Sequence, residues 1–143
     1  MSDKILSMLG LMRRANAIQI GEDNSGAAVK AGKAKLLLLA SDASDNARRR
    51  AEGFLYGHNA VPVSLPYTKE EIAMSVGVSG CSMAAVTDMG FANALMKALA
   101  LTDSDKYGGL AAEVESRFLK TERRKATRRH GEEKRATVKG GQT

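Results

Sequence analysis

Apolar residues recur at three- and four-residue intervals in several stretches of the chain, which is the period of an amphipathic helix. In the first stretch, Ile5, Leu9 and Met12 fall on one face of a helix predicted over 2–15. The same pattern, with acidic residues in first turns and glycines at ends, predicts further helices at 22–31, 44–56, 68–76 and 91–101.

Polar residues at the starts of these segments can cap the helices. Thr68 and Glu71 have the spacing of a capping box, in which each side chain accepts a hydrogen bond from the other residue's backbone N–H. Single caps are predicted for three other helices: Ser2, Asp42 or Ser44, and Asp88.

Short apolar runs between turn residues predict strands at 18–20, 35–40, 61–65 and 83–87. The unbroken leucines of the second run favour a strand that is buried on both faces. Pro62 lacks a backbone N–H, so its strand is expected at an edge of the sheet. Helices alternating with strands predict an α/β fold, with a small sheet covered by helices.

The chain then changes character. Residues 1–101 form the predicted folded domain, and 102–143 form a predicted C-terminal arm that is partly helical or disordered. Asp103, Gly108 and Gly109 suggest a hinge before a short helical stripe. The whole chain of 143 residues has a net charge of +6, and residues 117–143 alone carry ten basic and three acidic residues.

This asymmetry describes a nearly neutral body with a basic arm, a plan typical of proteins that bind nucleic acid. A solvated tail that merely keeps the protein soluble is the alternative interpretation. We hypothesise that the arm contacts phosphates through five clustered basic residues: Arg123, Arg124, Lys125, Arg128 and Arg129.

The chemistry-bearing residues are few, which argues against an enzyme. Cys81 is the single cysteine, and neither His58 nor His130 has a partner at a spacing typical of metal ligands or of a nucleophile and its base. We therefore expect no catalytic residue, metal or cofactor. The chain also lacks a long apolar run and, at its start, the pattern of a signal peptide, so we expect a cytoplasmic protein away from membranes.

Five ordered fragments carry a family resemblance, and they extend over about residues 1–101. They are Leu9–Ala15, Gly21–Asp23, Val29–Leu36 together with Ala40–Ser44, Val61–Val63 and Ala85–Ala92. Together they resemble the bacterial YlxQ-type branch of the ribosomal-protein superfamily typified by the archaeal kink-turn binder L-seven-Ae.

The resemblance implies a three-layer α/β/α sandwich with a small mixed central sheet, and binding to structured RNA on or near the ribosome. It also implies two adjacent contact segments, the turn into the second helix and the loop before the last strand. Candidate RNA-binding residues in these segments are Gly21, Glu22, Asp23, Asn24, Val78, Ser79, Gly80 and Cys81.

Physical reasons support the same segments. A helix N-terminus exposes unpaired N–H groups to phosphate or base edges, and a glycine-containing loop can approach bent RNA closely. Kink-turn binders usually carry asparagine, then glutamate, then a lysine three residues later, whereas this chain has Asp23, Asn24 and Ala27. The hydrogen-bonding pattern offered to a base edge is therefore changed, and one cation is lost.

Each candidate also has a plain structural interpretation. Glu22 and Asp23 suit the start of a helix because they complement its dipole. Lys33 is a candidate phosphate contact, but it can equally be a solvated loop residue. The triplet Arg48–Arg50 is interpreted as a solvated helix face.

Two functions from different classes follow. The first is a monomeric, non-catalytic RNA-binding protein associated with the ribosome and recognising structured, kink-turn-like RNA. The second is a protein–protein adaptor on the same fold, whose basic tail gives only non-specific affinity for RNA.

Overall fold

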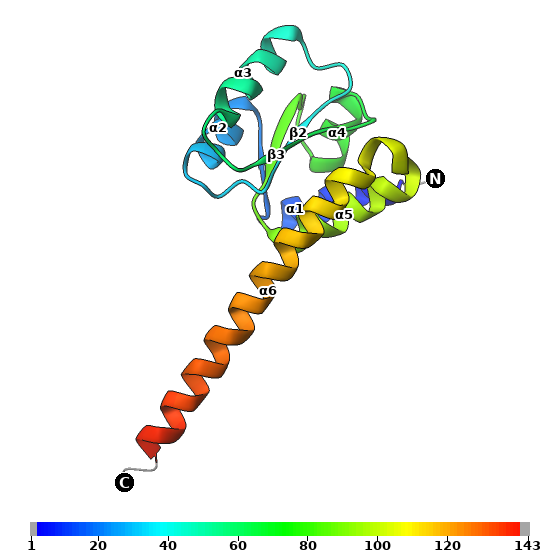
Figure 1. The fold of residues 1–143 in the computed structure, drawn as a ribbon. Helices are drawn as coiled ribbons and strands as arrows, with labels where there is room; N and C mark the ends of the chain where they lie inside the picture. The colour runs from blue at the N-terminus through cyan, green and yellow to red at the C-terminus, as the bar shows by residue number, and fades with distance from the viewer. Residues whose placement is uncertain (1–2, 141–143) are drawn as a thin grey trace.

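The computed structural model describes residues 3–140, with side chains described up to residue 129. Figure 1 shows a body of helices around a small sheet, from which one long helix extends. The helices are α1 (Lys4–Arg14), α2 (Glu22–Lys30), α3 (Asp45–Leu55), α4 (Lys69–Val76), α5 (Met89–Thr102) and α6 (Ser104–Gly140). The strands are β1 (Ile18–Ile20), β2 (Leu36–Leu39), β3 (Val61–Ser64) and β4 (Met83–Val86).

The four strands form one mixed sheet in the order β1-β4-β2-β3. β2 and β3 are parallel, whereas β4 is antiparallel to both of its neighbours, β1 and β2. β3, which contains Pro62, lies at an edge of the sheet, as the missing N–H of proline requires. The α/β class and the mixed sheet are thus confirmed.

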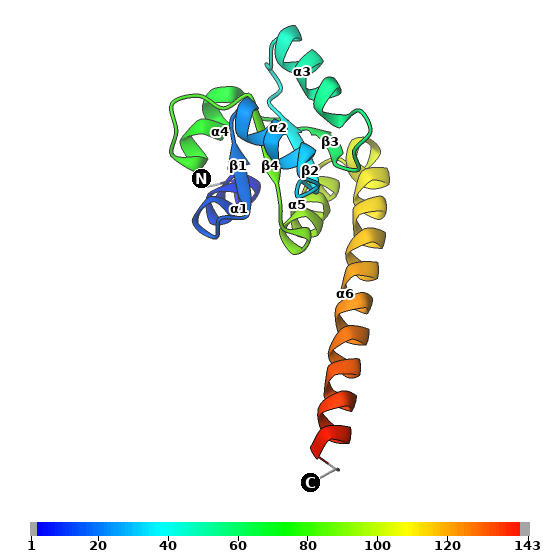
Figure 2. The same ribbon diagram turned by 90° about the vertical axis from the view of Figure 1, so that its left-hand side faces the viewer.

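The sheet is buried on both faces by helices. On one face, Leu36, Leu38 and Val86 belong to a core that also contains residues of α1, α4, α5 and α6. On the other, Leu37 and Ala85 pack with residues of α2 and α3. Side chains alternate across a strand, so the unbroken leucines of β2 supply both cores. Figures 1 and 2 show the resulting three layers.

The predicted caps are confirmed at three helices and corrected at one. Ser44 and Asp88 accept backbone hydrogen bonds at the starts of α3 and α5, and Thr68 forms its capping box with Glu71. For α1 the cap is Asp3 and not Ser2, which lies outside the described residues. The Asp3 carboxylate accepts from two first-turn amides, which a residue one position earlier could not reach in this register.

The hinge suggested by the sequence is absent from the described residues of the arm, where α6 is one continuous helix. Gly108 and Gly109 lie inside it and do not form a hinge. Packing overrides the low helix propensity of glycine here, since Tyr107, Ala111 and Val114 are buried against the body. The Tyr107 hydroxyl also donates a 2.5 Å hydrogen bond to the carbonyl oxygen of Ser64.

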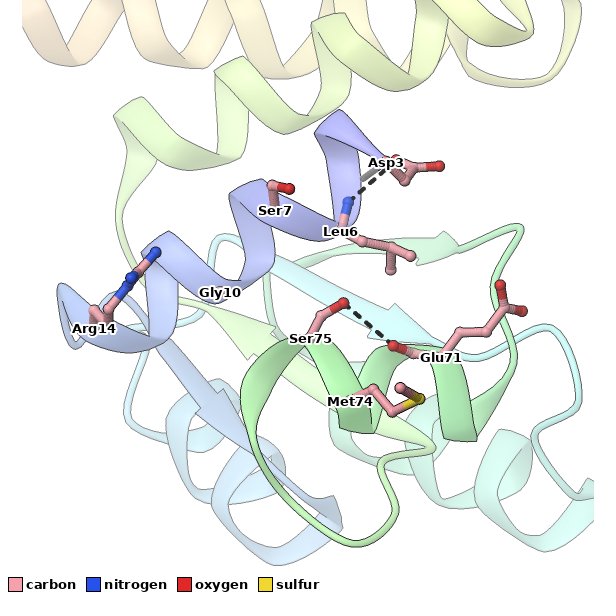
Figure 3. Close-up of a pocket in the computed structure, with 8 residues that line it drawn as sticks. All are labelled: Asp3, Leu6, Ser7, Gly10, Arg14, Glu71, Met74 and Ser75. Carbon is pink, nitrogen blue, oxygen red and sulfur yellow. Dashed lines mark hydrogen bonds between the residues drawn. The ribbon is translucent and has the colours of Figure 1, made fainter. Parts of the chain in front are cut away.

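Helices α1 and α4 pack closely, and a glycine makes the approach possible. Figure 3 shows Gly10 of α1 beside Ser75 of α4. A Cβ atom added at Gly10 would lie 2.9 Å from the Ser75 carbonyl oxygen, and this oxygen belongs to rigid helix backbone. By contrast, no described atom comes within 4 Å of a Cβ added at Gly53 in α3.

We therefore expect Gly10→Ala to destabilise the fold and Gly53→Ala to stabilise it. The first should lower the free energy of unfolding by about 1–2 kcal/mol, because overpacking outweighs the helix propensity of alanine. The second should raise it by up to about 1 kcal/mol. Urea denaturation followed by circular dichroism measures both, and equal shifts in the two variants would contradict the packing argument.

The cap of α1 is tied to the body by a second bond, in which the Tyr67 hydroxyl donates to Oδ2 of Asp3 at 2.8 Å. Burial raises the pKa of Asp3, but the hydrogen bonds from Tyr67 and from the amides of Leu6 and Ile5 outweigh it. The pKa of Asp3 therefore lies below its usual 3.8. A carboxylate with a lowered pKa stabilises the fold while it is ionised, and this stabilisation disappears as the pH falls through the folded-state pKa.

Asp3→Ala should lower the free energy of unfolding by about 1 kcal/mol at pH 7, since it removes the cap and the tyrosine bond. The difference from the unmodified chain should shrink as the pH falls below 3.8, where the unfolded state becomes protonated, and it should level off once the pH is also below the lower folded-state pKa. Urea titrations over the acid range test this, with Tyr67→Phe as the variant that keeps the cap. A difference that stays constant to the acid limit would rule out the linkage.

Candidate nucleic-acid interface

The two segments proposed to contact RNA lie side by side at one end of the sheet. β1 runs antiparallel to β4, with Ile20 opposite Ala84. The end of β1 therefore meets the start of β4, and the Gly21 N–H donates a 2.9 Å hydrogen bond to the Met83 carbonyl. This pairing places the turn into α2 next to the α4–β4 loop, residues 77–82, as the family resemblance implied.

Gly21 makes the turn into α2. Its backbone has φ of 94° and ψ of 162°, a conformation open to glycine but strained for residues with a side chain. It is also the N-cap of α2 and provides no side-chain hydrogen bond to the first helical amides. The N-terminus of α2 therefore presents N–H groups that are not capped by a side chain of residue 21.

The acidic residues of the first turn of α2 are held by one arginine of α3. Arg50 forms an ion pair with Glu22 and a second with Oδ1 of Asp23, at 3.1 Å. The hydrogen bond to Asp23 raises the pKa of Arg50 against the opposing effect of burial, and the charge of Glu22 adds to the increase. Arg50 remains exposed, with 47% of its side chain accessible, and it also brings a compensating cation to the turn.

The aromatic ring of Phe54 contacts this arginine, and the sequence alone did not reveal the contact. The Arg50 guanidinium lies 5.5 Å from the centre of the Phe54 ring, one helical turn away, and Lys30 lies 5.7 Å from the same ring. The ring packs where a Cβ at Gly26 would stand, at 2.6 Å. Gly26 therefore weakens α2 as a helix but permits the contact between α2 and α3.

A hollow of about 390 Å³ lies between the two segments, and we call it the loop hollow. Asn24 of the first segment and Val78 of the second both line it, so the structure brings these two candidates together. Five further lining residues were not singled out as candidates from the sequence: Arg13, Asn16, Ile18, Gln19 and Ile20. Asn16 has a positive φ of 56°, and an asparagine directly after a helix was a usable signal for such a turn.

A second hollow, of about 520 Å³, adjoins the first, and we call it the α2 hollow. It shares Asn16, Gln19 and Asn24 with the loop hollow, and it extends along α2 past Ala27 to Lys33. The sequence candidate Lys33 is therefore part of the same surface. It lines the same hollow as Ala27, the position that matches the lysine of kink-turn binders in the resemblance.

The remaining candidates in the α4–β4 loop differ in exposure. Ser79 and Gly80 are exposed and Val78 is half-buried, whereas Cys81 is only 3% exposed. The Cys81 thiol donates to the Met83 carbonyl at 3.4 Å, and burial raises its pKa. Any contact of Cys81 with a ligand in this conformation would therefore use its backbone and not its side chain.

The side-chain amide of Asn24 is hydrogen-bonded to the backbone of β1. Its amide nitrogen donates a 2.9 Å hydrogen bond to the carbonyl of Ile20, which belongs to the last residue of β1. The bond fixes the orientation of the side chain at the rim of both hollows. The carbonyl end of the Asn24 amide is thereby directed away from Ile20 and can accept a hydrogen bond from a ligand.

The basic arm residues lie elsewhere in the structure. All five candidates of the arm are exposed on α6. Figure 2 shows α6 descending from the body, while the loops described above lie towards the upper part of the view. The arm therefore adds charge at the other end of the sheet and does not contribute side chains to the loop hollow.

The comparisons give this geometry a family. The chain is 34% identical over 92 residues to the RNA-binding protein YlxQ of Bacillus subtilis, and the match covers 64% of this chain and 91% of that protein. The chain belongs to the YlxQ family. No family model matches the chain.

Two solved structures have the same fold as this YlxQ-family chain. A protein of unknown function from Bacillus halodurans matches with a TM-score of 0.62 and 25% identity, covering 68% of this chain and 97% of that one. The 15.5kD RNA binding protein of Giardia lamblia matches with a TM-score of 0.55 and 16% identity, covering 73% and 92%. At that identity the second match shows the fold alone.

Among the described residues of the YlxQ-family chain, no group of three His, Cys, Asp or Glu side chains is placed to hold a metal ion. None of the helices in this part of the chain is long and apolar enough to span a membrane.

The burial of Cys81 leads to a test of the loop conformation. A buried thiol with a raised pKa should react with Ellman's reagent at pH 7.5 at least about tenfold more slowly in the folded chain than in urea, because the thiolate is both rare and shielded. Equal rates in the two conditions would show that the α4–β4 loop opens readily in solution.

Proposed function

We propose that this YlxQ-family chain is a non-catalytic, monomeric RNA-binding protein that associates with the ribosome in the cytoplasm and recognises structured RNA of the kink-turn type. The observation that carries the proposal is the pairing of β1 with β4, which joins the Gly21 turn and the α4–β4 loop into one surface. The name of the Bacillus subtilis relative supports RNA as the ligand.

The proposed contacts follow from the groups around the loop hollow. The uncapped amides of α2 suit a phosphate or the polar edge of a base. Val78 suits the face of an unstacked base, and Ser79 offers an exposed hydroxyl next to it. Arg13, which also lines the hollow, adds a donor for phosphate or guanine.

Recognition of a kink-turn draws support from the cations around α2. Ala27 lacks the usual basic side chain, but Lys33 lines the same hollow. Arg50 pairs with both acidic residues of the turn and so reduces their repulsion of phosphate. The departures from the usual motif are thus partly compensated in space by residues outside it.

The basic arm is proposed to add electrostatic affinity. Arg123, Arg124 and Arg128 are exposed on a helix that leaves the body, so a phosphate backbone can reach them. A chain truncated after residue 101 would lose the buried Tyr107 and Val114 and is unsuitable as a test. Truncation after Leu119 keeps these core residues and removes the clustered charges.

The second candidate function, a protein–protein adaptor, is favoured by a different surface. Met74 is 79% exposed on α4, and Leu11 of α1 is 51% exposed. Figure 3 shows Met74 at the rim of a shallow hollow between the two helices. Apolar side chains of this size exposed on adjacent helices are typical of a protein contact.

A matched pair of variants separates the two functions. Ser79→Glu introduces a negative charge at the RNA surface and should weaken binding of a kink-turn RNA hairpin at least about tenfold in a gel-shift assay, because it repels phosphate. Met74→Glu adds the same charge on α4 and should leave RNA affinity unchanged. Ribosome association is measured for both variants by co-sedimentation in a sucrose gradient.

The opposite pattern would favour the adaptor. Unchanged RNA binding by Ser79→Glu, together with loss of ribosome co-sedimentation by Met74→Glu, would place the functional surface on α1 and α4. Circular dichroism melting of both variants controls for folding.

A further inference from the structure

A third hollow, of about 460 Å³, lies where α6 leaves the body, and we call it the α6 hollow. One wall is the loop between α2 and β2, which contributes Lys35. The other wall is α6, which contributes Lys120 and Arg124. The hollow lies at the end of the sheet opposite the Gly21 turn, because its lining includes residues just before β2 and β3.

Arg117 holds the two walls of the α6 hollow together. Its guanidinium donates to the Asn59 carbonyl at 2.6 Å and to Oε1 of Glu113 at 2.7 Å. Asn59 precedes β3, so this arginine fixes the direction in which α6 leaves the body. The hollow consequently lies at a junction where Arg117 ties α6 to the segment before β3.

The other cations of the α6 hollow have no carboxylate partner among the described side chains. Lys35, Lys120 and Arg124 form no ion pair there, whereas Lys97, Arg117 and Lys125 do. Lys120 and Arg124 are one helical turn apart, where two like charges destabilise a helix. Charges gathered at this cost, around a cavity without carboxylates, are suited to an anionic ligand.

The α6 hollow is also linked to the interface described above. The loop that follows α2 contributes Lys33 to the α2 hollow and Lys35 to the α6 hollow. A ligand strand that follows α2 from the Gly21 turn to the end of the helix would therefore meet first Lys33 and then Lys35. Beyond them it would reach Lys120 and Arg124 on α6.

We propose that the α6 hollow is a second phosphate-binding site, which takes the backbone of the same RNA strand after it has passed along α2. The inference rests on the proposed RNA-binding function and adds to it a defined exit path for the strand. The phosphates are contacted from two sides, by Lys35 of the body and by Lys120 and Arg124 of α6. The part of α6 nearest the body thus contributes side chains to a defined binding site, in addition to the electrostatic attraction that the whole arm exerts on RNA.

The test compares two double variants that remove equal charge. Lys120→Gln/Arg124→Gln removes both cations from one wall of the α6 hollow. Lys4→Gln/Lys69→Gln is the control, since both residues are exposed on other helices, α1 and α4, and neither lines the hollow. Affinity for a fluorescein-labelled kink-turn hairpin with a single-stranded uridine tail is measured by anisotropy at several salt concentrations.

We expect the first double variant to weaken binding about tenfold and to reduce the slope of log affinity against log salt by about 1.4, the value for two contacts on a single strand. The control should change the slope by much less. Lys35→Gln alone should also weaken binding, and its effect should shrink in the background of the first double variant, because both walls hold the same phosphates.

Three outcomes would overturn the inference. Equal losses in both double variants would show that only the net charge of the chain matters, and no loss in either would show that the hollow is not used. In both cases the unmodified chain still binds the hairpin. The proposed RNA-binding function is then retained, and the phosphate site in the α6 hollow is refuted. Absence of binding by the unmodified chain would remove the proposed function, and the inference with it.

Discussion

The antiparallel pairing of β1 with β4 is the constraint on which the rest of the surface depends. Because the two strands run in opposite directions, the end of one and the start of the other are held at the same edge of the sheet. The hydrogen bond from Gly21 to Met83 closes this junction. Two segments separated by about sixty residues of chain are thereby fixed beside each other, and the loop hollow exists only because of it.

Negative and positive charges are concentrated in different parts of the structure. The turn into α2 carries two acidic residues, and Arg50 from α3 pairs with both. The body can therefore complement the dipole of α2 without presenting a strongly negative surface. The excess of positive charge is carried by α6, whose first turns are anchored through Tyr107 and Arg117 and whose later turns extend from the body.

Much of the fold was predictable because it is encoded locally. The capping box at Thr68, the caps at Ser44 and Asp88 and the edge position of Pro62 each depend on a few neighbouring residues. The continuity of α6 was not predictable in this way, because Gly108 and Gly109 suggest a break. Burial of Tyr107 and Val114 against α5 overrides that local preference, and burial depends on the whole chain.

The sequence by itself determined the order of helices and strands, the glycine required at position 21, the position of most helix caps and the location of the positive charge. Each of these follows from short-range sterics, hydrogen bonding or counting. Only the tertiary structure decided that Arg50 pairs with the two acidic residues of the turn, that Arg13, Asn16 and Gln19 join the candidate interface, and that Cys81 faces inward. These outcomes depend on which side chains meet across the packed layers, and spacing along the chain carries no information about distances between elements that are remote in sequence.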